Sequence, residues 1–347
     1  MVAAIVADPG DEAAWMVYAD WLLERNHPRG ELIQLGPLAA SGDRAAAWRI
    51  RALEADEDVF LSPRLLERAA QWRFAFERGF LRLAEFHHHA RQSVDAEAIG
   101  ALCADAHAGL LATLVLQIFE YTRNYDPVTG TDLPQYLRTD VGDLGAELGR
   151  LRRLDRLVVH GVACDALVHR NLRQLKTDSL TCRGARIDLP ALEVLEWAAR
   201  SEQDAWGAVL DVPLPRLRSV SIGRGYESMI APLAASPIAG RLQRFAIVTD
   251  DVTTIETLAR HSGAFANLSE LDVRGIHEDL EQIEVDRLRQ GLERVFPRCS
   301  IGIRWSDLLP DPPEVVPARD LDAVEVDEQS RRPDGTIDAM AKFNRGR

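Results

Sequence analysis

Two groups of histidine and cysteine residues have the side chains that a metal site needs. One is the run of three histidines at 87–89, which falls on an expected strand. Because successive side chains of a strand point to opposite faces, only the outer two histidines can converge, and no third ligand is evident. The other group is His160, Cys164 and Cys182, which could meet if neighbouring strands carry them, but a fourth ligand is missing. The sequence therefore predicts no metal site.

A cysteine and a histidine four residues apart suggest a nucleophile with its base. Cys103 and His107 would share one face of a helix, but nothing nearby supplies an orienting group or oxyanion donors. The glycine pair in Gly223-Arg224-Gly225 lacks the third glycine and the lysine of a phosphate-binding loop. We therefore expect a protein that is not an enzyme and uses no cofactor. An enzyme of unrecognised type is the third alternative.

Charge and composition narrow the classes of partner. The 347 residues carry 54 acidic and 41 basic side chains, a formal net charge of −13, which opposes binding to nucleic acid or to an anionic membrane. No stretch reaches the roughly 18 apolar residues that a membrane span requires. The amino terminus lacks the features of a signal peptide, and the four cysteines have no CxxC spacing. These features predict a cytoplasmic protein without nucleic-acid or membrane partners.

The first 78 residues have the pattern of a helical module. Asp8-Pro9-Gly10 is typical of a helix start, with Asp8 as the N-cap and Pro9 at the first helical position. Apolar residues recur at helical spacing over 14–22, and Pro28 ends that helix. Three further helices are expected to complete the module, over 29–38, 45–53 and 63–76.

Part of this module resembles a known family. The residues that carry the resemblance are Asp8-Pro9-Gly10-Asp11, Val17-Tyr18-Ala19-Asp20-Trp21-Leu22-Leu23-Glu24-Arg25 and Pro28-Arg29-Gly30-Glu31-Leu32-Ile33-Gln34-Leu35. This run is similar to the bacterial repeat-companion domain, a short helical module that often precedes leucine-rich repeats. Arg78-Gly79-Phe80-Leu81 resembles the junction before the first repeat strand. The resemblance implies no catalytic residues, and we expect Tyr18 and Trp21 to bury their rings.

From residue 80 the chain repeats the pattern L-x-x-L-x-L, in which a short strand buries its apolar side chains against neighbouring units. The frames that begin at Leu192, Leu217, Leu242 and Leu268 follow one another at 25, 25 and 26 residues, as in leucine-rich repeats. Segments with helical composition lie between them, but the asparagine ladder typical of such repeats is missing. We predict an α/β fold with three parts: a helical repeat-companion module over 1–78, an irregular leucine-rich-repeat solenoid over 79–306, and a disordered tail over 307–347.

Two segments differ from the repeats. The insertion 121–145 is rich in Asp, Thr, Gly and Pro and is expected to be a surface loop. In the tail, 309–317 is too rich in proline for helix or sheet, 311–328 carries a net charge of −6 and 331–347 one of +3. Such blocks seldom fold alone, but two apolar sets could order on a partner: Leu321, Val324 and Val326, or Ile337, Met340 and Phe343.

In the predicted repeats, the residues between the apolar strand positions face the concave side. The candidate partner-binding residues there are Arg156, His160, Lys176, Glu196, Arg244, Glu270, Asp272 and Arg274. A concave surface of mixed charge suits recognition of another protein better than of a uniformly charged polymer. We therefore expect a non-enzymatic scaffold that binds a protein on this face, in an oligomeric state that the sequence leaves open.

A second function is compatible with the same features. The chain could be a regulatory inhibitor or effector of a bacterial defence or stress-signalling circuit. In that interpretation it holds a partner, such as a sequestered regulator, and is released or activated when a protease cuts the tail or the 121–145 loop.

Overall fold

The computed structural model describes most of the chain before residue 305. The described residues are 1–55, 59–87, 96–117, 122–125, 132–135, 139–140, 144–160, 162–177, 181–197, 203–223, 227–249, 252–275 and 282–304. The chain divides into two compact units, Met1–Leu309 and Pro310–Arg347, and all described residues belong to the first. The predicted tail, 307–347, lies outside the described residues, so its disorder stays a prediction.

The first long helix begins three residues later than a cap at Asp8 would place it. This helix, α2 (Glu12–Leu23), has Asp11 as its N-cap, and the Asp11 carboxylate accepts a hydrogen bond from the N–H of Ala14 over 3.1 Å. The predicted cap at Asp8 is wrong, because that side chain accepts from the N–H of Gly10 and so closes the preceding turn.

The rings of Tyr18 and Trp21 differ in burial. Tyr18 is 6 % exposed and packs on Phe80, whereas Trp21 is 38 % exposed and lies beneath the guanidinium of Arg25. The expectation that both rings are buried is therefore wrong for Trp21, whose outer face is covered by a cation.

A strand replaces the second half of the predicted helix over 63–76. The remaining amino-terminal helices are α1 (Val2–Ala7), α3 (Pro28–Ala40), α4 (Arg44–Glu54) and α5 (Pro63–Leu66). After α5, aromatic residues alternate with smaller or polar ones, and this period of two forms β1 (Trp72–Glu77). β1 pairs antiparallel with β2 (Phe80–His87), so the sequence interpretation of 63–76 as one helix is wrong.

A ten-stranded sheet runs through this unit, in the order β1-β2-β3-β7-β9-β11-β12-β13-β14-β15. Only β1 and β2 are antiparallel, and every later pair of neighbours is parallel. The fold class is therefore mixed α/β with a large, mostly parallel sheet, and the α/β prediction is confirmed. The later strands are β3 (Thr113–Gln117), β7 (Arg156–His160), β9 (Gln174–Thr177), β11 (Val194–Trp197), β12 (Ser219–Ile222), β13 (Arg244–Val248), β14 (Glu270–Arg274) and β15 (Ser300–Arg304).

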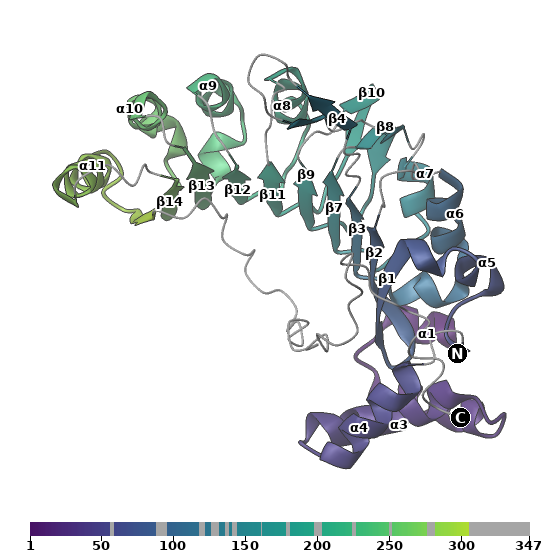
Figure 1. The fold of residues 1–347 in the computed structure, drawn as a ribbon. Helices are drawn as coiled ribbons and strands as arrows, with labels where there is room; N and C mark the ends of the chain where they lie inside the picture. Colours follow the sequence, from purple (N-terminus) through teal and green to yellow (C-terminus); the bar gives the residue numbers. More distant parts are fainter. Residues whose placement is uncertain are drawn as a thin grey trace. The chain divides into compact units, whose positions relative to one another are not determined.

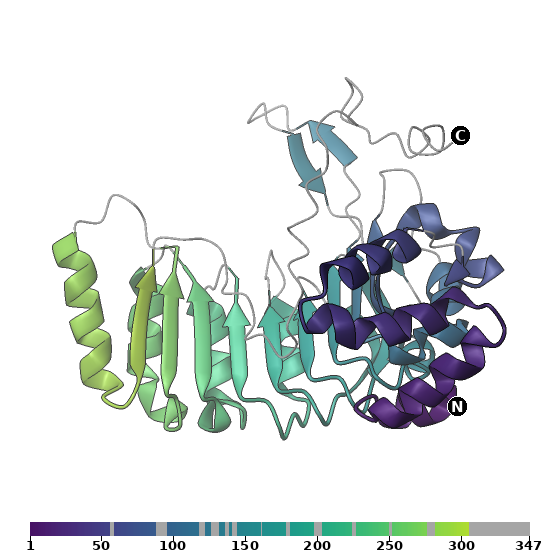
Figure 2. The same cartoon turned by 90° about the horizontal axis from the view of Figure 1, so that it is seen from below.

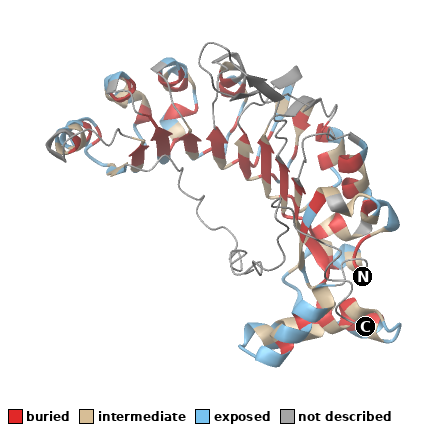
Figure 3. Cartoon of the chain, viewed as in Figure 1, coloured by how far each residue is buried: buried red, intermediate tan, exposed pale blue. Residues whose placement is uncertain are grey.

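The strand register aligns the apolar positions of the L-x-x-L-x-L frames. Leu195 of β11 lies beside Val220 of β12, followed by Phe245 of β13 and Leu271 of β14. These four side chains are at most 1 % exposed and belong to one core cluster. Figure 3 shows these strands mostly in red, the colour of buried residues. A second buried row lies two residues further along each strand and holds Trp197, Ile222, Ile247 and Val273. The spacing in the sequence thus predicts which strand residues share the core.

Helices cover one face of the sheet. Figure 1 shows the sheet bent, with α6 to α11 on the outer side of the bend and no described helix on the inner side of β3 to β15. Figure 2 shows the strands of the second half standing side by side. Of the described helices, none is both long and apolar enough to cross a bilayer. The covering helices are α6 (Ala96–Ala104), α7 (Leu144–Leu148), α8 (Gln203–Leu210), α9 (Glu227–Ala235), α10 (Val252–Arg260) and α11 (Gln282–Val295).

The insertion 121–145 contains strands where a plain surface loop is predicted. Among its described residues, β4 (Thr122–Tyr125) and β5 (Asp132–Gln135) pair antiparallel. β6 (Thr139–Asp140) joins a small parallel sheet with β8 (Val162–Val168) and β10 (Thr181–Asp188). The loop prediction is therefore wrong for these residues.

Candidate interaction surface

The inner face is defined here as the side of β7 to β15 that no described helix covers (Figure 1). Because side chains alternate along a strand, the residues between and beside the two buried rows point to this face. Its middle row runs through Lys176, Glu196, Ser221, Ala246, Asp272 and Gly302. All eight residues predicted for the concave side belong to it: Arg156, His160, Lys176, Glu196, Arg244, Glu270, Asp272 and Arg274.

Lys176 and Glu196 form an ion pair between β9 and β11. The register places them directly opposite each other, and Nζ of Lys176 lies 3.2 Å from Oε2 of Glu196. Glu196 is only 4 % exposed, and its Oε2 has no hydrogen-bond partner within the described part of the chain. Lys176 therefore supplies the counter-charge of the buried Glu196 carboxylate. This ion pair holds the Lys176 ammonium group in place on the inner face.

Arg244 and Glu270 form a second pair, between β13 and β14. Nε of Arg244 donates a hydrogen bond to Oε2 of Glu270 over 2.6 Å, and both side chains are 47 % exposed. An ion pair with this exposure contributes only about 0–1 kcal/mol to folding. Each of these two side chains can therefore leave the ion pair and bind an opposite charge on a partner, with little loss of folding stability.

Asp272 lies between two arginines. Nε of Arg274 donates to Oδ2 of Asp272 over 2.8 Å, and Nε of Arg304 lies 3.7 Å from Oδ1. The carboxylate has room because the opposite residue is Gly302, where a Cβ atom would lie 2.9 Å from Oδ1. Gly302 and Arg304 were not predicted from the sequence, although both occupy inward positions of β15, the strand that follows the frame at Leu268. The signal that could have identified them is their alternation with the apolar residues Ile301 and Ile303 along the strand.

The eight predicted residues differ in exposure. Three are buried, namely Glu196, Asp272 and Arg274. These three predicted partner-binding residues offer little surface to a partner, because side chains on neighbouring strands about 4.8 Å away cover them. Their ion pairs offset the burial of charge. Of the eight predicted residues, the five that a partner can reach are Arg156, His160, Lys176, Arg244 and Glu270.

Cys103 and His107 do not share a helix face. α6 ends at Ala104, and His107 lies in a separate 3-10 turn that Asp105 caps. Burial raises the pKa of the Cys103 thiol to about 12 and lowers the pKa of His107 to about 4. Both groups are therefore neutral near pH 7, and the thiol lacks the thiolate character of a nucleophile.

The groups considered for metal or nucleotide binding lie partly outside the described residues. This applies to two of the histidines at 87–89 and to the second residue of the glycine pair at 223–225. The backbone register sets Cys164 opposite Cys182 in the small sheet, whereas His160 belongs to the large sheet. Among the described residues, no three His, Cys, Asp or Glu residues gather as metal ligands.

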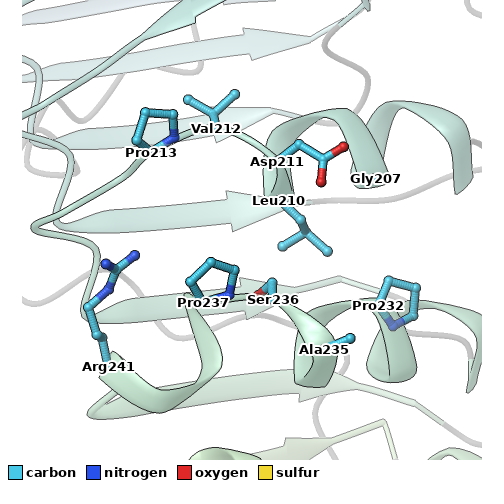
Figure 4. A pocket seen from close by; sticks show the side chains of 10 residues that line it. All are labelled: Gly207, Leu210, Asp211, Val212, Pro213, Pro232, Ala235, Ser236, Pro237 and Arg241. Atoms are coloured by element: carbon cyan, nitrogen blue, oxygen red, sulfur yellow. The ribbon is translucent and has the colours of Figure 1, made fainter.

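A cavity of about 480 Å³ lies on the helix-covered side, between the segment after α8 and the end of α9 (Figure 4). Pro213, Pro232 and Pro237 line it, and its charged groups are Asp211 and Arg241. Nη2 of Arg241 donates to the carbonyl O of Leu214 over 3.3 Å. The lining therefore offers one carboxylate and one anchored guanidinium, and it contains no His, Cys or Lys side chain.

The chain was compared with protein-family models and with curated proteins. No family model matches the chain, and no curated protein matches it. The resemblance to the repeat-companion domain therefore stays a prediction, and the function has to be argued from the inner face.

Proposed function

We propose that this chain is a non-enzymatic interaction scaffold whose inner face binds another protein. The observation that carries the proposal is the series of cross-strand ion pairs on a helix-free sheet face, from Lys176 with Glu196 to Asp272 with Arg304. We further propose that the body is an irregular leucine-rich-repeat solenoid, which is supported by the frames that β11 to β14 carry in register.

The ion pairs suit selective recognition because they fix charges before a partner arrives. Buried Glu196 holds the ammonium of Lys176, and buried Asp272 faces the guanidinium of exposed Arg304. A partner with acidic groups opposite these cations is favoured, whereas one with basic groups meets like charges that cost several kcal/mol. Specificity thus follows from where the charges are held.

A pull-down from the native host, followed by mass spectrometry, tests this proposal. The bait is the intact chain, compared with Arg244→Glu on the inner face and Arg287→Glu on α11, where the side chain is also exposed. Both variants change the net charge equally. We expect a partner that the intact chain and Arg287→Glu retain and that Arg244→Glu loses. Equal retention by both variants would contradict binding through this face.

The alternative of a regulator released by proteolysis stays a second prediction. Much of 121–145 and all of 307–347 lie outside the described residues. If that alternative holds, the partner found above stays bound to the intact chain and leaves after limited proteolysis in either segment. The same pull-down, repeated with cut chain, separates the two functions.

A further inference from the structure

The cavity of about 480 Å³ beside α8 and α9 has walls from two successive parts of the chain. One wall is the end of α8 with the segment after it, through Pro213, and the other is the end of α9 with the segment after it, through Pro237 (Figure 4). Figure 4 shows Arg241 at one end of the cavity and Gly207 with Pro232 at the other. The cavity therefore has one basic end.

Two hydrogen bonds join the walls. Nε1 of Trp206 in α8 donates to the carbonyl O of Met229 in α9 over 3.1 Å, and Trp206 is buried. At the basic end, Nη2 of Arg241 donates to the carbonyl O of Leu214 over 3.3 Å. The three prolines of the lining add rigidity, because the proline ring fixes φ. A site that is already formed spends less binding free energy on ordering its walls.

The guanidinium of Arg241 has no counter-charge on its own chain. Among the described residues, its hydrogen bond goes to the neutral carbonyl of Leu214, and its Nε atom is buried without an acceptor. Arginine binds carboxylates through short, charge-assisted hydrogen bonds. A half-buried arginine that is anchored but not neutralised therefore suits a ligand carboxylate.

The rest of the lining is mostly apolar. Leu210 points into the cavity in Figure 4, and the three prolines add further apolar surface. Ser236 is polar, but its hydroxyl already donates to the carbonyl O of Leu233 over 2.7 Å. Small-molecule sites typically combine an apolar lining with a few polar groups that fix orientation. The ligand therefore needs an apolar body as well as its carboxylate.

Asp211 limits the ligand to one carboxylate. Asp211 is exposed and lies beside Gly207 in Figure 4, away from Arg241. A second negative group of the ligand at that end would meet a like charge.

The size of the cavity favours a free small molecule over a protein segment. Its volume lies within the roughly 300–1,000 Å³ of small-molecule sites. Ten residues line it, whereas each side of a typical protein interface has roughly 20–30. We propose that this cavity binds a small monocarboxylate with an apolar body, such as an aryl-substituted short-chain acid. Its carboxylate pairs with Arg241, and its apolar body contacts Leu210 and the prolines.

Titration of the full chain by ligand-observed NMR tests this site. The probes are phenylacetate, 3-phenylpropionate and 4-phenylbutyrate, which carry one carboxylate at increasing distance from the ring. We expect the best of them to bind with a Kd of about 1 mM or lower. The alcohol with the same skeleton lacks the charge, and 1,4-phenylenediacetate adds a second carboxylate. Both should bind at least about fivefold more weakly.

Two pairs of variants locate the binding. Arg241→Gln should weaken it at least about tenfold, whereas Arg216→Gln removes an exposed arginine outside the lining and should have no effect. Ala235→Phe fills the cavity and keeps Arg241, so it should also weaken binding and tests the site independently if Arg241→Gln fails to fold. Its control is Ala231→Phe, on the same helix and outside the lining. Circular dichroism shows which variants are folded.

Three results would overturn the proposal. The first is the absence of saturable binding of all three monocarboxylates up to about 10 mM. The second is equal affinity for the acid and its alcohol, since the guanidinium would then contribute nothing. The third is equal affinity of Ala235→Phe and Ala231→Phe, which would place the ligand elsewhere. Arg244→Glu lies on the inner face and should bind these acids like the natural chain, so the outcome is independent of the protein-binding function proposed above.

Discussion

Arg29 in α3 donates a hydrogen bond from Nε to the carbonyl O of Gly79, 50 residues later, over 2.9 Å. Arg29 is 1 % exposed, and its guanidinium lies over the ring of Phe80, 4.6 Å from the ring centroid. Gly79 has a φ of +75°, and a Cβ atom there would lie 2.8 Å from Cγ of Arg29. This contact fixes α3 against the first turn of the sheet.

Replacing Gly79 tests this contact. Gly79→Ala should lower the free energy of unfolding by more than about 1 kcal/mol, because it combines a strained φ with a clash at Arg29. Gly42→Ala is the control, since its φ is +96° but nothing lies within 4 Å of the added atom. Urea unfolding of both variants measures the difference. Equal losses would mean that strain alone matters and that Arg29 moves aside freely.

The Asp272 cluster should be far more sensitive to substitution than the exposed pair on the same face. Asp272→Ala removes the carboxylate that accepts a hydrogen bond from the buried guanidinium of Arg274, and breaking a buried pair costs about 3–5 kcal/mol. Glu270→Ala removes an exposed partner of Arg244 and should cost at most about 1 kcal/mol. Denaturant midpoints of the two variants compare these costs directly. A neutral Asp272→Ala would show that the cluster is not buried in solution.

Stability should fall on acidification because of His107. Burial lowers its pKa in the folded chain to about 4, below the ordinary value of 6.5. Between these values the unfolded chain binds the proton and the folded chain does not, so stability rises with pH across this range and is lost as pH falls from about 6.5 to 4. His107→Gln should flatten this part of the pH profile in thermal unfolding. A profile unchanged by His107→Gln would contradict the assignment.

The cysteines at 103 and 299 should resist alkylation in the folded chain. Burial raises the pKa of Cys103 to about 12 and that of Cys299 to about 11, so little thiolate is present at neutral pH. Iodoacetamide labelling, mapped by mass spectrometry, should modify both only after denaturation. Rapid native labelling of Cys103 would show an activated thiol and would revive the enzymatic alternative.

The repeat spacing predicted which residues form the strands and face the core better than it predicted how exposed the other strand residues are. Buried strand positions such as Val220 and Phe245 follow from a local pattern, because one frame specifies both the strand and its inward side. The burial of Asp272 could not be read in this way. It depends on Gly302, which lies opposite only after the chain has passed through α11. Position along the frame therefore identified the face of a side chain but not its exposure.

The misassigned helix over 63–76 has a similar cause. Its apolar residues satisfy a helical period over the first turn, and the alternation that forms β1 occupies only the second half. A short strand of this kind is stabilised by pairing with β2, which a local pattern does not contain. The Arg78-Gly79 turn was the signal that could have indicated a hairpin.

The reversed direction of β1 makes the two ends of the sheet unequal as sites for lengthening. A duplicated strand–helix unit is a parallel unit, and it can be spliced in between any two of the parallel strands or after β15 without changing the rest. If the same duplicated unit were inserted before β2, it would have to displace β1, which forms an antiparallel hairpin with β2. Variants of this architecture with more or fewer units should therefore differ in the region after β2, while the hairpin and the helices before it keep a constant length.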